Sequence, residues 1–596
     1  MLGQLRQKIV IGALVLACMA LTLDSCSHQG ANGGGAAASE PPATSNTSFV
    51  QGPISAPGGP FLYDRYGRVV ILHGVNAVFK KPPFELVPAP GKPWNFTNAD
   101  AAKIASFGFD IVRLGIIWQG LEPGYGSIND PATCTKGTPG NAHEYNQSII
   151  NKYLSRLDKT VSILAAHGIF TLIDMHQDVW NQAFEGEGAP NWAVCTNSIA
   201  IKNIPGRWSG NYAQSALEAA YNNFFTNDVV GNLQGNYDRV WASVASYFKN
   251  NAWVIGYDPF NEPTGGATTS LHNAPFDALL QCFYAGRANP GSVNIAGAQQ
   301  GGLASGAVGG AKLTCPPDDP RLGVIPTIEK ADPNHLVFPE TDIASDGVPT
   351  YIGPMAFGRL VLNFHNYCLF RQNNGNDIPG QAGTCAALDG LTFTRRFAER
   401  AADASPAQPG GPAWFLSEFG ATNSKSELNT MTNDADLNLV GWAYWQFKTY
   451  EDPTGSSNEA LVTNKDKPYN KIYYLDRPYA QAIAGMPIAM SYNVTSDTFQ
   501  LRYKPDYHLR VPTVVFVPVS LHYKHGYCAT ASGATVVSKP NASKLLVENV
   551  SPASNAPASH ASASNAPGRS SKIMPASSST SRTSLAWIEI RPGACH

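Results

Sequence analysis

Short apolar runs alternate with amphipathic segments through most of the chain. The runs are rich in Val, Ile, Leu and Phe without polar alternation, which is typical of strands buried on both faces of a parallel sheet. The segments between them repeat apolar residues at helical spacing. Eight strand candidates result, at 69–76, 110–115, 168–174, 253–262, 335–340, 360–364, 413–418 and 439–445.

Eight strands, most separated by a helix, over about 400 residues predict a (β/α)8 TIM barrel with insertions. Helices are expected at 98–107, with Asn98 as N-cap, and at 146–167, 236–250, 325–332 and 391–404. The alternative, a doubly wound open sheet, requires a Gly-rich nucleotide-binding turn after an early strand, and the sequence contains none.

After residue 483 the pattern changes to short β runs separated by Gly, Pro and Asn turns. The runs lie at 488–494, 498–503, 513–519, 534–537, 544–550 and 586–590. They predict a C-terminal antiparallel β-sandwich over 483–596, which leaves 55–482 for the barrel. A tract at about 551–584, rich in Ser, Ala and Pro, interrupts the sandwich, and we expect it to be disordered.

The N-terminus has the pattern of an export signal. Arg6 and Lys8 precede an apolar run at 9–23 that is too short for a stable membrane anchor. Leu23-Asp24-Ser25-Cys26 resembles a bacterial lipoprotein cleavage box, although Asp24 departs from the small or apolar residue usual there. We therefore expect a signal peptide over 1–26, a flexible linker over 27–54, and a chain that is either secreted or anchored to the cell envelope through Cys26.

Eight cysteines follow Cys26, and none are in a CxxC spacing. An even number in an exported chain favours disulfides over metal ligation. Sequence neighbours suggest the pairs 134–195, 282–315, 368–385 and 528–595, while the connectivity stays open.

Composition excludes some partners. The formal net charge is -2 and the pI is about 6.7, so the chain lacks the basic footprint of a nucleic-acid-binding protein. No apolar stretch after the N-terminal run is long enough for a transmembrane helix. We expect a monomer without a metal or other cofactor.

Two strand candidates end in an acid. The fourth ends in Asn261-Glu262-Pro263, and the seventh ends in Glu418, followed by Phe419-Gly420. The C-terminal ends of barrel strands converge on one pocket, so Glu262 and Glu418 are expected to meet there. Paired carboxylates about 5–5.5 Å apart suit cleavage of a glycosidic bond with retention of configuration. The alternative is two unrelated rim carboxylates in salt bridges.

These motifs resemble the acid/base and nucleophile motifs of family 5 glycoside hydrolases. Further positions match that family's pattern, namely Arg113, His176, His365, Tyr367 and Trp445. The closer resemblance is to the endoglycoceramidase-like branch, through the segments 74–83, 174–178 and 256–263 in the barrel and 515–518 and 526–527 in the sandwich. The resemblance covers roughly residues 55–550 and the last strand.

The resemblance implies roles for five residues at the reacting centre. Glu262 would be the general acid/base, with a pKa raised by its pocket and by the neighbouring carboxylate. Glu418 would be the nucleophile, with Arg113 and Tyr367 as its donors. Asn261 would hydrogen-bond the sugar 2-hydroxyl. For Arg113 a purely structural ion-pair role is the alternative, and it is compatible with orienting Glu418.

The resemblance also implies a sugar-binding group. Trp445 would form the floor of the reacting-sugar subsite, although aromatic residues are often plain core. Lys80 and Asp178 resemble the polar pair that holds the glycan in this branch, and the register with Pro82-Pro83 favours Lys80 over Lys81.

Two histidines, His176 and His365, would fix the hydrogen-bond network of the site. The alternative is a metal site in which both ligate together with Asp178. Three closely spaced ligands with an open position are not evident in the sequence, so we expect no metal.

The resulting hypothesis is a retaining β-glycosidase that hydrolyses the bond between a glycan and a lipid. Its partner would be a glycolipid or another β-glycoside, with membrane-surface association through the substrate or through an N-terminal lipid. An apolar patch on the 177–235 or 264–325 excursion would seat the lipid, but the sequence locates none. The alternatives are a β-glucanase or cellulase-like polysaccharide hydrolase and a catalytically inactive carbohydrate-binding surface protein.

Overall fold

The computed structural model describes most of the chain beyond its N-terminus. The described residues are 47–140, 145–264, 274–286, 323–342, 353–368, 382–455, 458–551 and 585–595. The expected signal peptide, most of the linker and the tract after residue 551 lie outside them. Within the described part of the chain, no helix has both the length and the apolar character needed to cross a membrane.

Eight parallel strands form the central sheet, in the order β7-β6-β5-β4-β3-β10-β9-β8. They are β3 (His73–Ala77), β4 (Ile111–Ile116), β5 (Phe170–Met175), β6 (Val254–Asp258), β7 (Leu336–Val337), β8 (Val361–Asn366), β9 (Ala413–Phe419) and β10 (Gly441–Tyr444). Parallel bridges from Val337 to Leu360 and from Glu340 to Asn363 join the two end strands and close the sheet. The predicted (β/α)8 barrel is confirmed.

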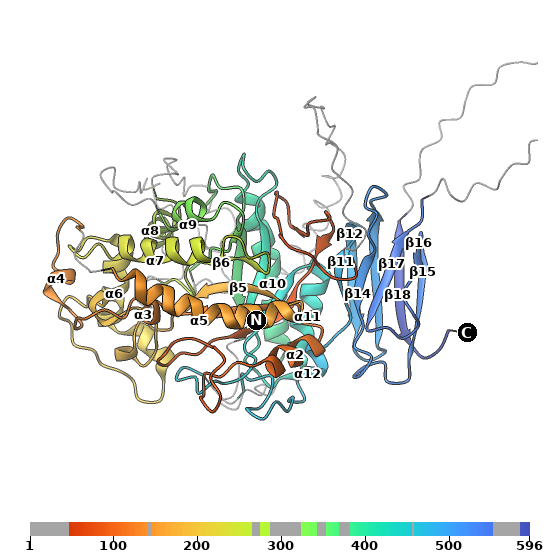
Figure 1. Cartoon of the computed structure of the whole chain (residues 1–596), viewed down its shortest axis with the longest axis horizontal. Helices are drawn as coiled ribbons and strands as arrows, with labels where there is room; N and C mark the ends of the chain where they lie inside the picture. The colour runs from red at the N-terminus through yellow and green to blue at the C-terminus, as the bar shows by residue number, and fades with distance from the viewer. Residues whose placement is uncertain are drawn as a thin grey trace, which may run out of the picture. The chain divides into compact units, whose positions relative to one another are not determined.

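Helices surround these strands and lie between them in the chain (Figure 1). The longer ones are α2 (Asn98–Ser106), α5 (Gln147–Ala166), α6 (Ser215–Thr226), α7 (Leu233–Phe248), α8 (Ala274–Ala285), α9 (Val324–Ala331), α10 (Ala382–Ala402) and α11 (Lys425–Asn438). Short helical turns are α3 (Trp118–Leu121), α4 (Pro131–Cys134), α12 (Ile472–Leu475), η1 (Gln182–Phe184), η2 (Asn191–Ala193) and η3 (Trp208–Ala213).

Three predicted elements differ in detail from the structure. Thr97, not Asn98, caps α2, because its side chain accepts from Asp100 N while the Asp100 carboxylate accepts from Thr97 N in a capping box. Helix α10 begins at Ala382 rather than at 391. The single strand expected over 69–76 is divided into β2 (Val69–Val70) and β3, which belong to different sheets.

The C-terminal region forms two antiparallel sheets, which confirms the predicted β-sandwich. The six-stranded sheet holds β1 (Leu62–Tyr63), β2, β11 (Tyr479–Ile483), β14 (Thr513–Phe516), β17 (Lys544–Asn549) and β16 (Ala534–Val536). The four-stranded sheet holds β12 (Gly485–Asn493), β13 (Thr498–Pro505), β18 (Ala586–Pro592) and β15 (Tyr527–Ser532). Because β1, β2 and β11 precede residue 483 and join this layer, the division of the chain at 483 stays a prediction.

An aromatic stack joins the N-terminal end of the barrel to the six-stranded sheet. The His73 ring of β3 lies between Trp442 of β10 and Tyr479 of β11, with centroid distances of 4.2 and 3.7 Å. The Asp110 carboxylate accepts from His73 N at 3.0 Å. The sandwich therefore covers the barrel end opposite to the strand ends where the acids were expected.

Three of the four suggested disulfides lie among the described residues. They are 134–195, 368–385 and 528–595. The first ties the excursion after β4 to the excursion after β5, and the last ties β15 to the C-terminus. The suggested 282–315 pair includes Cys315, which lies outside the described residues.

We predict that the closeness of β3 to β4 makes Gly74 indispensable for stability. A Cβ at this position would lie 1.9 Å from Ile111 O, whereas a Cβ on Gly383 in α10 would meet nothing within 4 Å. Gly74→Ala should therefore cost about 1–3 kcal/mol of unfolding free energy, as overpacking does. The control Gly383→Ala should gain up to about 1 kcal/mol, since Ala is the better helix former. Denaturant unfolding measures both, and equal stabilities would contradict the packing.

Candidate active site

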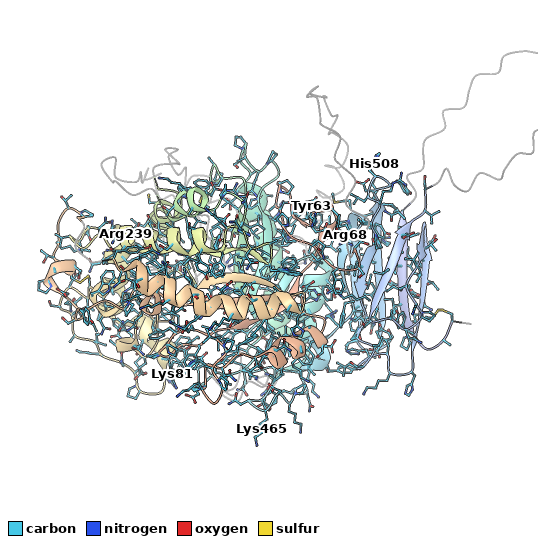
Figure 2. All side chains as sticks on the ribbon, in the orientation of Figure 1. Tyr63, Arg68, Lys81, Arg239, Lys465 and His508 are labelled. Carbon is cyan, nitrogen blue, oxygen red and sulfur yellow. A yellow bond between two sulfur atoms is a disulfide. The ribbon has the colours of Figure 1, made fainter. Side chains whose placement is uncertain are left out.

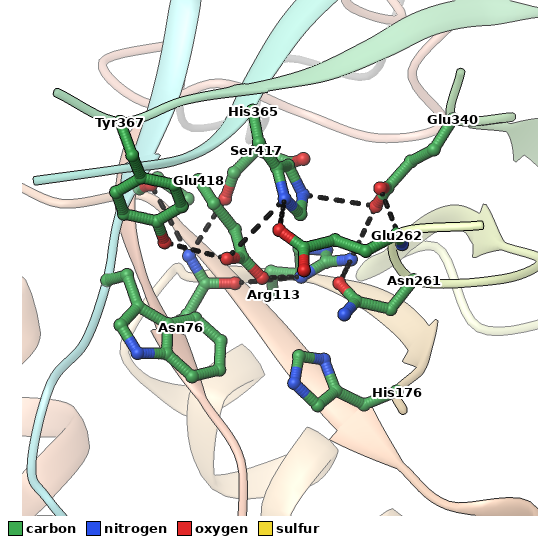
Figure 3. Close-up of polar contacts among 12 residues, drawn as sticks. Asn76, Arg113, His176, Asn261, Glu262, Glu340, His365, Tyr367, Ser417 and Glu418 are labelled. Atoms are coloured by element: carbon green, nitrogen blue, oxygen red, sulfur yellow. Dashed lines mark hydrogen bonds and ion pairs between the residues drawn. The ribbon is translucent and has the colours of Figure 1, made fainter. Parts of the chain in front are cut away.

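A single arginine lies at the centre of the barrel mouth. Arg113 on β4 is fully buried and donates to carboxylates from four other strands or their ends. Figure 3 shows two of these acids, Glu340 and Glu418, beside the guanidinium. Its acceptors are Asp174 Oδ1 at 3.0 Å, Asp258 Oδ2 at 2.7 Å, Glu340 Oε1 at 2.8 Å and Glu418 Oε1 at 2.5 Å. Buried charges are stable only when they are paired and hydrogen-bonded. This cluster therefore fixes the relative positions of the strand ends.

Glu418 lies near the C-terminal end of β9 and is 4% exposed. Both of its carboxylate oxygens accept hydrogen bonds. Oε1 accepts from Arg113, and Oε2 accepts from the Tyr367 hydroxyl at 2.7 Å. The structure thus places both expected donors on this acid, and they fix the orientation of its carboxylate.

Glu262 follows the end of β6 in a left-handed conformation, with φ 47°. Such a backbone costs of order 1–3 kcal/mol and persists only where its surroundings hold it. Glu340 Oε2 accepts from Glu262 N at 2.9 Å, and Gln177 Nε2 donates to Glu262 O at 3.1 Å. These two contacts hold the turn that directs the Glu262 side chain toward Glu418 (Figure 3).

The electrostatics of Glu262 suit a proton donor. Burial raises the pKa of Glu262 to about 7, although the hydrogen bond with His365 opposes the rise and the charge of Glu418 adds to it. Burial acts to lower the pKa of His365, but the carboxylates of Glu340 and Glu418 outweigh burial and raise it well above its ordinary value. Near neutral pH the site therefore holds an imidazolium beside a carboxyl group that is about half protonated.

The two acids lie close together. One oxygen of Glu262, one oxygen of Glu418 and a ring nitrogen of His365 are all within 4.8 Å of one another. His365 Nδ1 is 2.8 Å from Glu262 Oε1 and 3.6 Å from Glu418 Oε2. The barrel thus brings the ends of its fourth and seventh strands together, and both acids are parts of one buried network.

The amide of Asn261 is fixed at both ends. Its Oδ1 accepts from Arg113 Nη2 at 2.8 Å, and its Nδ2 donates to Gln177 O at 2.9 Å. Asn261 is 1% exposed and immediately precedes Glu262. The amide is therefore oriented by the same arginine that holds Glu418.

A second charged group lies beside this network, around Lys80. Its ammonium donates to Asp178 Oδ2 at 2.5 Å and to Thr454 Oγ1 at 2.7 Å, and it lies 3.1 Å from Asp452 Oδ2. The Lys80 side chain is 3% exposed, whereas 43% of the Lys81 side chain is exposed at the surface (Figure 2). The structure therefore places Lys80, the residue favoured by the register, in the buried pair with Asp178.

Trp445 connects the two groups. Its ring stacks on His176 at a centroid distance of 5.1 Å, and Lys80 Nζ lies 4.4 Å from the ring centroid. His176 Nδ1 is 2.8 Å from Asp174 Oδ2. Burial opposes protonation of His176, but Asp174 outweighs burial and raises the pKa of His176 to about 10. The indole face therefore meets cationic groups rather than other apolar side chains.

Among the described residues, three sets of ligand atoms have metal-like spacing, and none matches the set considered from the sequence. One set joins Glu427 to Cys368 and Cys385, whose sulfurs are already bonded in a disulfide. His176 and Asp178 lie with Glu187, while His365 lies with the two acids. The Lys80 ammonium already neutralises Asp178, and His365 already pairs with Glu262. A divalent cation would have to displace these charges, so the donor sets fit an ion-pair network better than a metal centre.

Sequence reasoning did not assign roles to several members of the network, namely Asn76, Asp174, Asp258, Glu340 and Asn363. Glu340 ends the fifth strand candidate, so the rule that selected Glu262 and Glu418 applied to it equally. Asp174 is the penultimate residue of the third strand, and Asp258 ends the fourth. The sequence feature that could have identified these acids is their recurrence at the ends of strand candidates, around one arginine within a strand.

Comparison with known proteins places the chain in a family. A model of the cellulase domain of glycosyl hydrolase family 5 matches residues 73–292, and a model of the glycoside hydrolase family 5 C-terminal domain matches residues 477–560. The two models describe one family and match different parts of the chain in their expected order. The chain belongs to glycoside hydrolase family 5. It is therefore a glycoside hydrolase.

Relatives and solved structures agree with this assignment. The chain is 27% identical to endoglycoceramidase I of Rhodococcus hoagii over 82% of this chain and 84% of that protein. Its fold matches endo-glycoceramidase II from Rhodococcus sp. in a ganglioside GM3 complex, with TM-score 0.63, 20% identity and coverage of 90% and 100% of the two chains. The lactosyl-enzyme intermediate of that protein matches with TM-score 0.61, 21% identity and the same coverage.

We predict that Lys80 and Lys81 differ sharply in importance. Lys80→Met would leave Asp178 and Asp452 buried without their cation and should cost about 3–5 kcal/mol. Lys81→Met removes a surface ion pair with Glu451 and should change stability by less than about 1 kcal/mol.

Asp178 holds the pKa of Lys80 well above its ordinary value of 10.5 in spite of burial. The contribution of Lys80 should therefore be constant below pH 10.5 and be lost as the pH rises from there through the folded-state pKa. Thermal unfolding from pH 6 to 9 measures the two variants. Equal losses at the two positions would contradict the buried pair.

Proposed function

We propose that this family 5 member is a retaining β-glycosidase that hydrolyses the bond between a glycan and a lipid. Glu262 is the general acid/base and Glu418 is the nucleophile. The observation that carries the proposal is the separation of the two acids, since an oxygen of each lies within 4.8 Å of the other. Retaining glycosidases hold their carboxyl groups about 5–5.5 Å apart, whereas inverting enzymes need about 6.5–9.5 Å to admit a water.

In the first step Glu418 attacks the anomeric carbon and forms a glycosyl ester. Glu262 gives its proton to the glycosidic oxygen, so that the aglycone leaves as a neutral alcohol. Arg113 and Tyr367 hold the two Glu418 oxygens, which keeps the attacking carboxylate aimed at the sugar. His365 Nδ1, at 2.8 Å, stabilises the carboxylate that Glu262 becomes.

In the second step Glu262 takes a proton from water, which attacks the anomeric carbon and releases the sugar from Glu418. The charge of Glu418 contributes to the raised pKa of Glu262. Formation of the ester removes that charge, so the pKa of Glu262 falls as soon as it must act as a base. The same carboxyl group can therefore serve as acid and then as base.

The remaining residues bind and orient the sugar. Asn261 presents its amide next to Glu262, where a contact with the 2-hydroxyl strengthens in the transition state. Trp445 contacts Lys80 and His176 and is the proposed floor of the reacting-sugar subsite, and the pair of Lys80 and Asp178 supplies a cation and a carboxylate for hydroxyl groups. His176 holds Trp445 through ring stacking.

Support for a lipid aglycone comes from the relatives. The R. hoagii relative is an endoglycoceramidase, and the similar solved structure is a complex of endo-glycoceramidase II with ganglioside GM3. A glycolipid substrate also agrees with export of the chain by an N-terminal signal over 1–26, which we propose from its pattern of basic and apolar residues.

We predict that the chain releases sugar from lipid-linked β-glycosides. Purified chain would be incubated with glycosphingolipid, steryl glucoside and cellulose-type polymer, and NMR would follow product and anomeric configuration. Release from a glycolipid with initial formation of the β-anomer is expected. Release from polymer alone would favour the β-glucanase alternative, and an initial α-anomer would contradict the double displacement.

The same assay tests Glu418. Glu418→Ala should abolish hydrolysis, and a slow 2-fluoro glycoside should label Glu418 in the unsubstituted chain, as peptide mass spectrometry would detect. Glu451→Gln is the control, because 56% of its side chain is exposed and it pairs only weakly with Lys81. Hydrolysis by Glu418→Ala would contradict its role.

We predict that kcat/KM for an unactivated glycoside falls as the pH rises through about 7, where Glu262 loses its proton. Glu262→Ala should lower this rate by about 10²–10⁴-fold and remove the basic limb. A dinitrophenyl glycoside needs no proton for departure, so its first step should be nearly unchanged. If kcat/KM of Glu262→Ala still fell with rising pH, the basic limb of the pH profile would belong to another titrating group.

A further inference from the structure

An exposed loop on the excursion after β5 combines apolar and basic side chains. We name residues 197–209 the Ile/Trp loop. Ile199 and Ile204 are 42% and 43% exposed, and Trp208 is half-buried. Single exposed aliphatic residues are common on protein surfaces, but several in one short loop together with a tryptophan mark an interaction surface.

The charge of the Ile/Trp loop is of one sign. Lys202 and Arg207 are both exposed, and the sequence from 188 to 217 contains no Asp or Glu. A membrane with anionic lipids has negatively charged headgroups outside and apolar chains below. Basic side chains next to exposed apolar ones complement it, because the aliphatic stems of Lys and Arg can lie along apolar groups while their charges meet the headgroups. The chemistry of the loop thus matches a lipid surface that contains anionic lipids.

The loop is held in place rather than loosely attached. Ile204 N donates to Asn211 Oδ1 at 2.8 Å, and Asn211 Nδ2 donates to Phe184 O at 2.8 Å. Asn203 Nδ2 donates to Ala183 O at 2.9 Å. The exposed isoleucines are therefore presented by an ordered backbone that is anchored to the segment following Asp178.

The Ile/Trp loop also leads to the site. The rings of Trp208 and Tyr212 lie 6.3 Å apart, and the Tyr212 hydroxyl accepts from Val179 N at 3.2 Å. The Tyr212 hydroxyl therefore contacts the backbone of the residue that follows Asp178 of the sugar-binding group. An aromatic path thus runs from the exposed loop to the edge of the site.

We propose that the Ile/Trp loop docks onto a membrane surface containing anionic lipids and so brings the barrel mouth to a lipid-anchored substrate. This inference rests on the proposed function for its purpose, but the binding itself is independent of catalysis. Each basic residue near an anionic membrane contributes about fivefold in partitioning, so the two together should contribute about 20–30-fold. The isoleucines and Trp208 supply an apolar contribution that does not depend on lipid charge.

The outer face of β12 and β13 offers a matched control. Met486 and Ile488 are 45% and 44% exposed there, and Arg502 and Lys504 are exposed on the neighbouring strand. This face has a similar composition, but Glu589 of β18 pairs with Gln500 of β13 on it, whereas the Ile/Trp loop has no acid and is the more cationic surface. If composition alone governed membrane binding, both surfaces would contribute equally.

The test uses the chain from residue 27 onward, so that neither the apolar run at 9–23 nor an N-terminal lipid on Cys26 contributes to vesicle binding. Co-sedimentation would be measured with vesicles of phosphatidylcholine alone and with added phosphatidylglycerol, both without glycolipid. We expect Lys202→Gln/Arg207→Gln to weaken binding to the anionic vesicles by about 20–30-fold. Ile199→Ser/Ile204→Ser should weaken binding to both kinds of vesicle. All variants should hydrolyse a soluble aryl β-glycoside normally, which also shows that they fold.

The matched variants Arg502→Gln/Lys504→Gln and Met486→Ser/Ile488→Ser should leave vesicle binding unchanged. Absence of vesicle binding by the parent chain, unchanged binding in the loop variants, or a loss confined to the sandwich variants would each overturn the proposal. Failure of the proposed function is separate, because it would be seen as lack of glycolipid hydrolysis while binding to glycolipid-free vesicles through the loop persists.

Discussion

The structure depends most on the compensation of several buried acids by one guanidinium. Arg113 is fully buried and contacts carboxylates from four other strands or their ends. Each of these acids would be costly to bury alone, and removal of the arginine would leave them all without a counter-charge. A lysine could not replace Arg113, because one ammonium group cannot reach all of the carboxylates that lie around the planar guanidinium. The barrel mouth is therefore set by the geometry of this one side chain.

Two glutamates with the same chemistry have different environments in this arrangement. Arg113 and Tyr367 donate to Glu418, whereas among the described residues the Glu262 carboxylate has its hydrogen bond with His365, and burial raises the pKa of Glu262 to about 7. Environments that separate two carboxyl groups in this way are how one site holds both an acid and a nucleophile near neutral pH. Glu340 links the two environments, since it contacts Arg113, His365 and Glu262 N.

The sequence supports the barrel and the two acids because each depends on a local pattern. Apolar runs mark the buried strands, and a run that ends in an acid marks the rim. The supporting network depends on long-range geometry instead. Nothing near Asp258 or Glu340 in the sequence reveals that both contact Arg113, and the division of 69–76 between two sheets depends on pairing with β11, which is distant in sequence. Likewise, the left-handed turn at Glu262 is held by contacts from other strands.

The two ends of the barrel are under different constraints. At the N-terminal end, the sandwich packs on the stack of His73 and Trp442. A substitution in the strands of this stack would therefore lower the stability of the fold rather than act directly on the reaction. At the C-terminal end, the strands hold the acids rigidly, while the long excursions between them are free to vary. Chemistry and substrate choice can therefore change separately. This separation explains how one chain matches a family model named for cellulase and a full-length relative that is an endoglycoceramidase. The strand ends carry the paired acids, and the loops beyond them are the part of a barrel that can change without moving those acids.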